Sequence, residues 1–216
     1  MRFKCDLRRK AILDAATALF RELGFERCSM SQISARVGGS KATLYSYFQS
    51  KDELFAAAMV DAMHEQGEAM LELLDPTESD VAKVLERFGN AYLNFVTGGS
   101  CLNNVRTAMQ ASSDSALGPS LYKLGPKKGW EDIAHYMAEV MQRGGLRRDD
   151  PHMAALMLKG MLESAVVYPM MFGAEPEYAT PIWVERVVCA FMRAYGPDSE
   201  ADDPAKLNIM DAAVTD

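Results

Sequence analysis

The chain has 216 residues, of which 49% are hydrophobic and 25% are charged, and its formal net charge at pH 7 is −7. This composition is typical of a globular protein, and the length suits one large domain or two small ones. The charged start Met1–Asp6 lacks the apolar stretch of a secretory signal, and no apolar run approaches the roughly 18 residues of a membrane-spanning helix. We therefore expect a soluble, cytoplasmic protein without a membrane partner.

The two parts of the chain differ in charge. Residues 1–51 hold ten lysines and arginines and four acids, for a net charge of +6, whereas the remaining residues hold 13 basic and 26 acidic side chains, for −13. A basic segment of this kind suits a polyanion such as nucleic acid. On charge alone, a chance fluctuation or solvated helix faces would account for the same asymmetry.

Motifs for metal binding and catalysis are missing from the sequence. The four cysteines are widely scattered without a CxxC pair, which predicts reduced thiols rather than a zinc site or a disulfide scaffold. The three histidines are isolated, and no HExxH, GxSxG, phosphate-loop or dinucleotide-binding pattern occurs. We therefore expect no catalytic residue, no metal and no cofactor, and a small-molecule enzyme is the least favoured function.

Helical periodicity runs along nearly the whole chain, and no alternating strand pattern is present. From Leu7 to Leu23, apolar side chains recur every three or four residues, and Gly24 ends the pattern, as expected for an amphipathic helix. The sequence therefore predicts an all-α protein.

Two short helices are predicted after this first helix. Ser29 and Gln32 form a capping box that opens a helix ended by Gly38-Gly39, and Ser40 caps a second helix that reaches Phe48. Two short helices joined by a glycine turn behind a longer helix form a helix-turn-helix unit.

A fourth, long helix is predicted to open at a second capping box, Ser50 to Glu53, and to run to about Leu74. Asp150 followed by Pro151 marks another helix start. The further helices are predicted at about residues 81–96, 102–112, 117–124, 127–142, 151–168 and 182–195.

The stretch Ala11–Phe55, AILDAATALFRELGFERCSMSQISARVGGSKATLYSYFQSKDELF, closely resembles the DNA-binding region of TetR-type (TetR/AcrR) transcriptional regulators. The "LF…GF" end of the first helix, the "SK-A-T-L-Y-x-Y-F" helix and the "SKDELF" entry to the fourth helix carry the resemblance. It covers about the first quarter of the chain and departs from the family in one respect. The turn usually has an apolar residue after its first glycine, whereas this chain has Gly38-Gly39, which predicts a looser turn.

The resemblance implies three segments and a function. They are a helix-turn-helix DNA-binding domain at residues 1–51, a ligand-binding and dimerisation domain at 52–196, and a tail at 197–216. The tail is predicted to be poorly ordered from its composition of six acids and one lysine. The implied function is that of a regulator, by family precedent a repressor, which binds a palindromic double-stranded operator as a homodimer and is released by a small, largely apolar effector. The alternative from another class is a helical interaction module that no longer reads DNA, with Gly39 as the symptom.

The predicted DNA-binding residues lie at the starts of the second, third and fourth helices. The N-terminal residues of a recognition helix meet base edges in the major groove, so Lys41 can donate to guanine and the Thr43 methyl can meet a thymine methyl. By the resemblance, Tyr45 and Tyr47 donate hydrogen bonds to phosphates. The complete set is Ser29, Ser31, Ser40, Lys41, Ala42, Thr43, Tyr45, Tyr47 and Lys51.

Two of these assignments have structural alternatives. Lys51 at the start of the fourth helix favours a phosphate, but it is equally consistent with a solvated helix cap. Each tyrosine is also consistent with a half-buried core aromatic.

The predicted ligand pocket follows from the 15 methionines, which suit an adaptable apolar pocket but are also ordinary core residues. Arg106 and Gln110 share one helical face and could orient a polar group of the ligand. The pocket set is Tyr92, Phe95, Arg106, Met109, Gln110, Trp130, Tyr136, Met137, Met141, Met161 and Tyr168.

The last two long helices are expected, by the resemblance, to pair with those of a second subunit, although an intramolecular core explains the same apolar stripes. The interface set is Met153, Leu156, Met157, Gly160, Met161, Ala165, Trp183, Val187, Ala190 and Phe191. We expect ligand binding to move the fourth helix and so change the spacing of the two recognition helices in the dimer.

Overall fold

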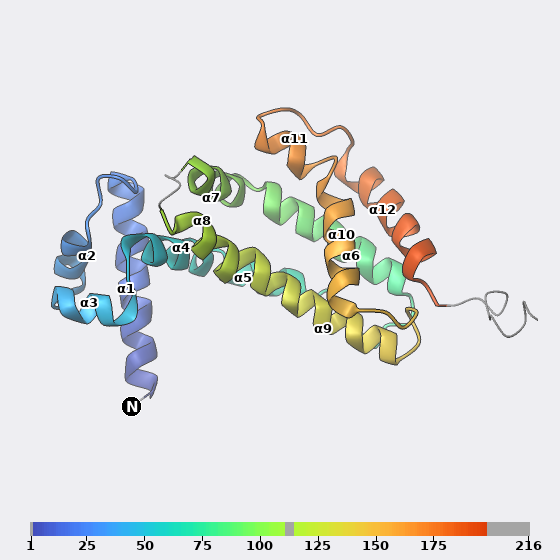
Figure 1. Ribbon diagram of the computed structural model, residues 1–216, viewed down its shortest axis with the longest axis horizontal. Helices are drawn as coiled ribbons and strands as arrows, with labels where there is room; N and C mark the ends of the chain where they lie inside the picture. The colour runs from blue at the N-terminus through green and yellow to red at the C-terminus, as the bar shows by residue number, and fades with distance from the viewer. Residues whose placement is uncertain (1, 111–114, 198–216) are drawn as a thin grey trace, which may run out of the picture. The chain divides into compact units, whose positions relative to one another are not determined.

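The computed structural model describes residues 2–110 and 115–197, and every regular element in this part of the chain is a helix, which confirms the all-α prediction (Figure 1). None of the described helices is long and apolar enough to cross a membrane. The predicted tail lies, apart from Pro197, outside the described residues. The helices are α1 (Arg2–Leu23), α2 (Met30–Val37), α3 (Lys41–Tyr47), α4 (Lys51–Asp61), α5 (His64–Leu71), α6 (Val81–Thr97), α7 (Gly99–Gln110), α8 (Leu117–Tyr122), the π-helix η1 (Lys123–Lys127), α9 (Lys128–Gln142), α10 (Pro151–Glu163), α11 (Val167–Met171) and α12 (Thr180–Tyr195).

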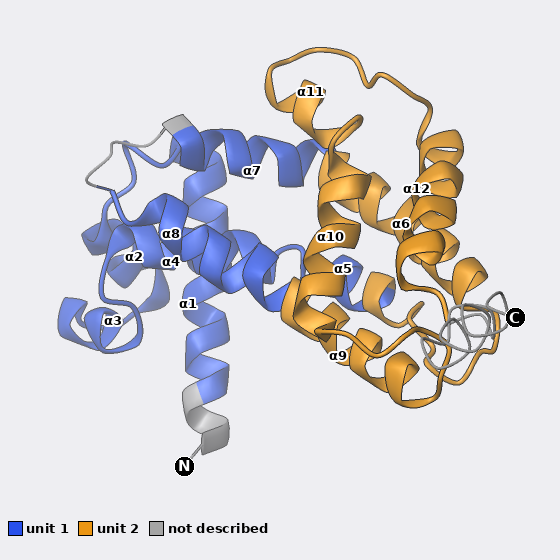
Figure 2. Ribbon diagram, turned by 45° about the vertical axis from the view of Figure 1, so that its right-hand side comes forward, with its two compact units in different colours: residues 1–69, 98–129 blue, residues 70–97, 130–216 orange. Residues whose placement is uncertain are grey.

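The described residues form two compact units, coloured separately in Figure 2. Unit 1 comprises residues 1–69 and 98–129, and unit 2 comprises residues 70–97 and 130–216. The chain therefore passes from one unit to the other after residues 69, 97 and 129. Unit 1 extends beyond the predicted boundary at residue 51, because α4, α7 and α8 belong to the same unit as α1 to α3.

The core of unit 1 is built around α1, which packs on α2 and α4, while α8 packs on α4. The buried side chains of α1 recur at the predicted helical spacing. They meet buried residues from α2, α3, α4 and α8, namely Ile33, Leu44, Leu54, Leu117 and Leu121. The helices α2 and α3 are too short to be stable alone, so packing against the rest of unit 1, α1 included, holds them in place.

The predicted caps of unit 1 are confirmed, with one difference. Ser29 and Gln32 make both bonds of a capping box at the start of α2. At the start of α4, the Ser50 hydroxyl accepts from the Glu53 amide at 3.0 Å. The Glu53 carboxylate, however, accepts from the amide of Gln49 at 2.7 Å rather than from that of Ser50.

The prediction of one helix from residue 51 to about Leu74 is wrong, because α4 ends at Asp61 and α5 begins at His64. At the break, the Met63 amide donates to the carbonyl of Val60, three residues back, instead of to the carbonyl four residues back. The polar run that follows, HEQGE, offers no continuous apolar stripe to hold a longer helix against a core.

Two further predicted helices end early, and in each case the helix that follows contains a proline. The helix predicted at 151–168 ends at Glu163, and Pro169 lies inside α11; since Pro169 has no amide hydrogen, it cannot donate to the carbonyl of Ala165. That carbonyl accepts instead from the Glu177 amide at 2.9 Å. The helix predicted at 117–124 ends at Tyr122 and continues as η1, which contains Pro126.

The core of unit 2 is formed by α6, α9, α10 and α12. Gly89 lets α6 approach its neighbours closely, since a Cβ there would lie 2.9 Å from a Val184 methyl and 3.3 Å from a Leu162 methyl. Inside this core, the Tyr92 ring meets the edge of Trp130 at a centroid distance of 5.1 Å. Aromatic side chains thus fill the centre of unit 2.

Candidate nucleic-acid interface

The seven-residue helix α3 has one face in the core of unit 1 and one face in solvent. Leu44 is 2% exposed and Phe48, directly after the helix, is 1% exposed, so these two residues fix α3 to unit 1. The opposite face presents Lys41, Ala42, Thr43, Tyr45 and Ser46, which are all exposed. A helix anchored in this way can enter a groove of DNA without unfolding.

The first turn of α3 is ordered by its own side chains. The Ser40 hydroxyl accepts from the Thr43 amide at 3.0 Å and shares a 2.9 Å hydrogen bond with the Thr43 hydroxyl. Lys41, between them, has no hydrogen-bond or ion-pair partner among the described residues. Its ammonium is therefore available to an external acceptor, as the sequence interpretation requires.

The two tyrosines of α3 differ in exposure. Tyr45 is 44% exposed, whereas Tyr47 is half-buried and packs against the core of unit 1. For Tyr47, the structural alternative that the sequence left open therefore holds for part of the side chain. A phosphate contact for either hydroxyl stays a prediction.

At the start of α2, the Ser29 side chain is occupied by the capping box, with its hydroxyl 2.8 Å from Oε1 of Gln32. Ser31 is exposed one residue inside the helix. Both residues are thus placed at a helix N-terminus, where amide hydrogens favour an anion.

Lys51 has a structural role that the sequence did not indicate. Its ammonium donates to the Phe25 carbonyl at 2.9 Å and lies 4.2 Å from the centroid of the Phe25 ring. The side chain is half-buried, so it is not the freely solvated cap considered as the alternative. It fixes the loop after α1, and a phosphate contact would have to be made from this position.

Other basic residues of the N-terminal segment are paired within unit 1. Lys10 lies 2.8 Å from carboxylate oxygens of both Asp14 and Asp61, and these hydrogen bonds raise the pKa of its ammonium. Arg36 forms a 2.8 Å ion pair with Glu22. Part of the basic excess is therefore neutralised inside the unit, which makes the unpartnered Lys41 more distinctive.

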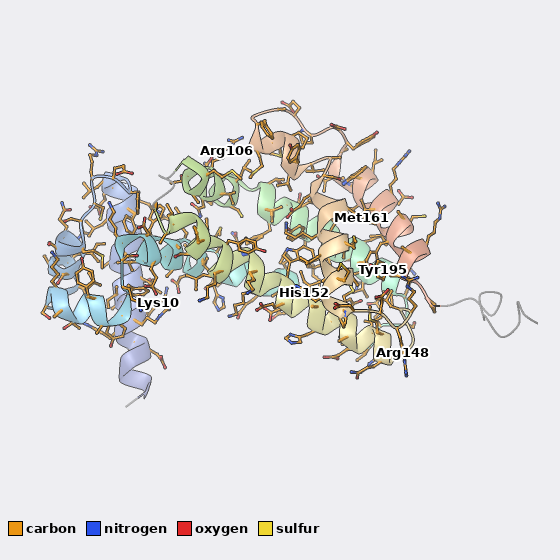
Figure 3. All side chains as sticks on the ribbon, viewed as in Figure 1. Lys10, Arg106, Arg148, His152, Met161 and Tyr195 are labelled. Carbon is orange, nitrogen blue, oxygen red and sulfur yellow. The ribbon has the colours of Figure 1, made fainter. Side chains whose placement is uncertain are left out.

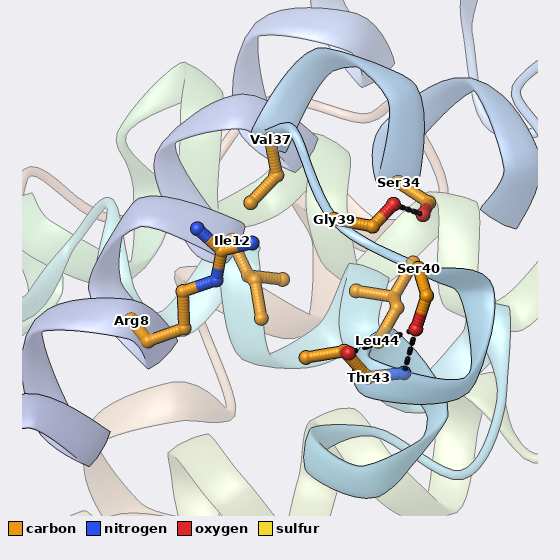
Figure 4. A pocket seen from close by; sticks show the side chains of 8 residues that line it. All are labelled: Arg8, Ile12, Ser34, Val37, Gly39, Ser40, Thr43 and Leu44. Carbon is orange, nitrogen blue, oxygen red and sulfur yellow. Dashed lines mark hydrogen bonds between the residues drawn. The ribbon is translucent and has the colours of Figure 1, made fainter.

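Both glycines of the turn between α2 and α3 accept a hydrogen bond from a side chain, and the bond at Gly39 is drawn in Figure 4. Gly38 adopts a left-handed conformation with φ of 71°, which favours glycine. Its carbonyl accepts from Arg8 at 3.2 Å, and the Gly39 carbonyl accepts from the Ser34 hydroxyl at 2.7 Å. The sequence interpretation missed Arg8, because nothing in its spacing indicates that it reaches this turn.

The predicted pocket residues fall into both units. In unit 2, Tyr92, Trp130, Tyr136, Met137 and Met141 are buried in the core, Phe95 and Met161 are half-buried, and Tyr168 is 64% exposed. Arg106 and Met109 lie on α7 in unit 1, where Met109 is 67% exposed, and the Gln110 side chain lies outside the described residues. Arg106 and Met161 are labelled on their helices in Figure 3.

A surface groove of unit 2 involves none of these predicted residues. It has a volume of about 450 Å³ and lies along α6 and α12. Its lining is mixed, with carboxylates, one arginine and apolar side chains: Ala82, Glu86, Glu185, Val188, Cys189, Met192 and Arg193. No sequence pattern indicates this groove, because its residues are spread over two helices about 100 positions apart.

Two of the predicted pocket residues, Tyr92 and Tyr136, place hydroxyl groups inside unit 2, and the sequence interpretation missed the carboxylate that Tyr92 contacts. The Tyr92 hydroxyl donates to the Glu163 carboxylate, which also pairs with Lys159. The Tyr136 hydroxyl is buried and has no hydrogen-bond partner among residues 2–110 and 115–197, and burial raises its pKa. An unpartnered buried hydroxyl is costly, which makes Tyr136 the most notable of the predicted pocket residues.

The predicted interface residues divide by exposure. Met153, Leu156, Met157, Gly160 and Ala190 are exposed, and Met161 and Trp183 are half-buried. Ala165, Val187 and Phe191 are buried within unit 2, as the alternative of an intramolecular core predicts, and their part in a dimer interface stays a prediction.

Three cysteines differ in exposure: Cys28 is buried, Cys101 is half-buried and Cys189 is exposed. Burial raises the pKa of the Cys28 thiol. Within the described ranges, no three histidine, cysteine or acidic side chains are grouped as metal ligands.

Family models match both parts of the chain. The model described as "Bacterial regulatory proteins, tetR family" matches residues 12–58. The model described as "AefR-like transcriptional repressor, C-terminal domain" matches residues 83–197, which is more than half of the chain.

Individual relatives and solved structures agree with these matches. The uncharacterized HTH-type transcriptional regulator YvaF of Bacillus subtilis is 26% identical over 197 residues, covering 89% of this chain and 98% of YvaF. The structure of the "Flavonoid-responsive Regulator FrrA" is 26% identical, with a TM-score of 0.65, and the alignment covers 90% of this chain and all of that one. A TetR-family regulator from Mesorhizobium loti shares the fold, with a TM-score of 0.70, 23% identity and coverage of 88% and 98%.

Proposed function

Because the chain belongs to the TetR family of bacterial DNA-binding transcriptional regulators, we propose that it is a ligand-responsive repressor that binds a palindromic operator as a homodimer. One observation carries the DNA-binding part of the proposal. The helix α3 is anchored by Leu44 and Phe48 and leaves Lys41 and Tyr45 exposed on its other side. The description of the C-terminal family model as a repressor supports the sign of the regulation.

In this proposal, the residues of α3 divide into two kinds of contact. Lys41 and Thr43, with the small Ala42 between them, meet base edges in the major groove and select the sequence. The two tyrosines, the serines at the starts of α2 and α3, and Lys51 meet the phosphates and set the register. The polar and basic character of the exposed face supports this division, since phosphate contacts dominate affinity.

The homodimer is supported by an apolar stripe on α10. Met153, Leu156, Met157 and Gly160 follow a helical spacing of three and four residues, and the three larger side chains are 47%, 39% and 47% exposed. On α12, Ala190 is exposed and Ile182 is 53% exposed. A symmetric interface built on such a stripe would match a palindrome, whose half-sites lie about 34–36 Å apart.

The effector in this proposal is a small, largely apolar molecule that binds in unit 2. The aromatic and methionine side chains gathered there support the apolar character, and the Tyr92 and Tyr136 hydroxyls supply polar groups. The related FrrA is a flavonoid-responsive regulator, and flavonoids are aromatic molecules with hydroxyl groups. A coupling of about 1–3 kcal/mol would change operator affinity roughly 5- to 150-fold.

A fluorescence-anisotropy titration tests the proposed function. The probe is a duplex from the DNA flanking the protein's own gene, and the control is a scrambled duplex of the same composition. We expect tighter binding to the flanking DNA and a steep loss of affinity with rising salt, because phosphate contacts release counterions. Equal, weak binding to both duplexes would favour the interaction module that no longer reads DNA.

A further inference from the structure

At the turn between α2 and α3, an arginine from another helix occupies the place of a missing side chain. A Cβ built on Gly39 would lie 2.5 Å from Nη2 of Arg8 and 3.7 Å from its Cζ. The φ of Gly39 is outside the left-handed region, so its backbone would accept a side chain. A side chain at position 39 would therefore displace the end of the flexible Arg8 side chain rather than strain the backbone.

The Arg8 guanidinium fits this space closely. It donates to the Gly38 carbonyl at 3.2 Å, and the hollow left around it measures about 10 Å³, too little for more than about one water molecule. Apolar side chains of Ile12, Val37 and Leu44 line the same hollow (Figure 4). Arg8 forms no ion pair with a carboxylate of the described residues, so the turn is its bonding partner.

The neighbouring Arg9 reaches the other end of α3. Its guanidinium lies 5.2 Å from the ring centroid of Phe48, which ends the helix. Two adjacent arginines of α1 thus contact both ends of α3: Arg8 contacts the turn before it, and Arg9 contacts Phe48 after it.

We propose that Arg8 is a positioning residue for DNA recognition: its guanidinium substitutes for a side chain at Gly39 and locks the turn that aims Lys41. Two adjacent glycines would otherwise leave the entry to α3 loose, because glycine populates many backbone conformations. The Arg8 bond to Gly38 and the Ser34 bond to Gly39 hold both peptides of this turn. Arg8 acts on DNA through the orientation of α3 and not through a phosphate contact of its own.

This role predicts a specific coupling between positions 8 and 39. Arg8→Ala removes the guanidinium, and Gly39→Ala displaces it, so each substitution breaks the same interaction. Substitutions that break one shared interaction are not additive. Gly39→Ala also reduces the conformational freedom of the unfolded chain. This effect is the same in the presence and in the absence of the Arg8 guanidinium, so it cancels from the coupling energy.

The experiment is a double-mutant cycle on the full-length protein with R8A, G39A and the R8A/G39A double variant. Thermal unfolding followed by circular dichroism and operator binding at several salt concentrations are measured for each. We expect each single variant to lower the affinity for the operator about 3- to 10-fold, because each loses one charged hydrogen bond. The double variant should bind the operator no more weakly than the weaker-binding single variant does. The dependence of log affinity on log salt stays unchanged. Arg21→Ala, on an exposed residue of the same helix, is the charge-matched control and should leave the ratio of specific to nonspecific binding intact.

Three results would overturn the proposal. One is a double variant whose loss equals the product of the single losses. Another is a salt slope that falls by about one in R8A, which would mark a direct phosphate contact. The third is an R8A that behaves like R21A. The proposal rests on the proposed DNA-binding function. The coupling measured in thermal unfolding, however, tests the contact between Arg8 and the turn without DNA. A protein that binds no operator but shows this coupling would contradict the proposed function and leave the Arg8 contact established.

Discussion

The candidate functional side chains of α3 in unit 1 and of the aromatic core in unit 2 differ in their exposure to solvent. Lys41 and Tyr45 stand in solvent while Leu44 anchors the helix, whereas Tyr92 and Trp130 are buried against each other. A DNA-reading surface must be exposed before its partner arrives, because the partner is far larger than any cavity. A site for a small apolar molecule is concave and buries most of its ligand, so its residues are hidden among those of the core.

The largest expected effect is a loss of stability on substitution of a side chain in the core of unit 2. Phe191→Ala should destabilise unit 2 by about 3–5 kcal/mol, because Phe191 is fully buried and its truncation leaves a cavity. Thermal unfolding measures this loss. If the variant unfolds like the parent protein but dissociates into monomers, Phe191 contributes to the dimer interface, as the sequence interpretation predicted, and not to the core.

The exposed stripe of α10 should respond differently. Met157→Glu should leave the fold of the monomer unchanged and weaken dimerisation by about 2 kcal/mol or more, since a carboxylate would be buried in an apolar contact. Sedimentation velocity at several protein concentrations measures the dimer, and circular dichroism checks the fold. Glu185→Gln, on the surface groove, serves as the control. Dimers of unchanged strength in M157E would rule out this stripe as the interface.

Lys51 lies between the two extremes, because it has both a structural and a proposed DNA-binding role. Lys51→Ala should cost about 1 kcal/mol of stability through the lost contact with Phe25. It should also lower affinity for all DNA sequences and reduce the salt slope by about 0.9. Parallel unfolding and titration experiments separate the two effects. A stability loss with an unchanged salt slope would leave Lys51 with its structural role alone.

The smallest expected effect is a pH dependence in unit 2. The hydrogen bond from Arg87 holds the pKa of Glu78 below its ordinary value of 4.5. The carboxylate therefore stabilises the folded state above pH 4.5, and this contribution is lost as the pH falls through the lower folded pKa. The melting temperature of Glu78→Gln should lie slightly below that of the parent protein at pH 7. The two should coincide at a pH where Glu78 is protonated in both states; a difference that persists there would exclude this cause.

Local signals explain how much of the fold was predictable. The capping boxes, the glycine after α1 and the apolar spacing placed α1, α2, α3 and α6 within a few residues. The predictions of continuous helices through residues 62 and 164 are wrong, because apolar periodicity continues across both breaks. A polar run follows the first break, and Pro169, which has no amide hydrogen to donate to the Ala165 carbonyl, follows the second.

The candidate site was predictable only where its residues are contiguous. The residues of α3 were found because they follow one another in a familiar pattern. Arg8 was missed because its contact with Gly38 spans 30 positions, and no periodicity reports such a contact. The chemistry of unit 2 was missed for the same reason, since Tyr92 and Glu163 meet across 71 positions.

The most direct test of the central claim is the base preference of Lys41→Ala. Affinities of the parent protein and this variant are measured against every single-base-pair substitution of the operator, with Arg148→Ala in unit 2 as the charge-matched control. If α3 reads the major groove, the variant loses about 1–3 kcal/mol of discrimination at one symmetric pair of positions and keeps its preferences elsewhere. A preference profile identical to that of R148A would contradict the assignment of α3 as the recognition helix.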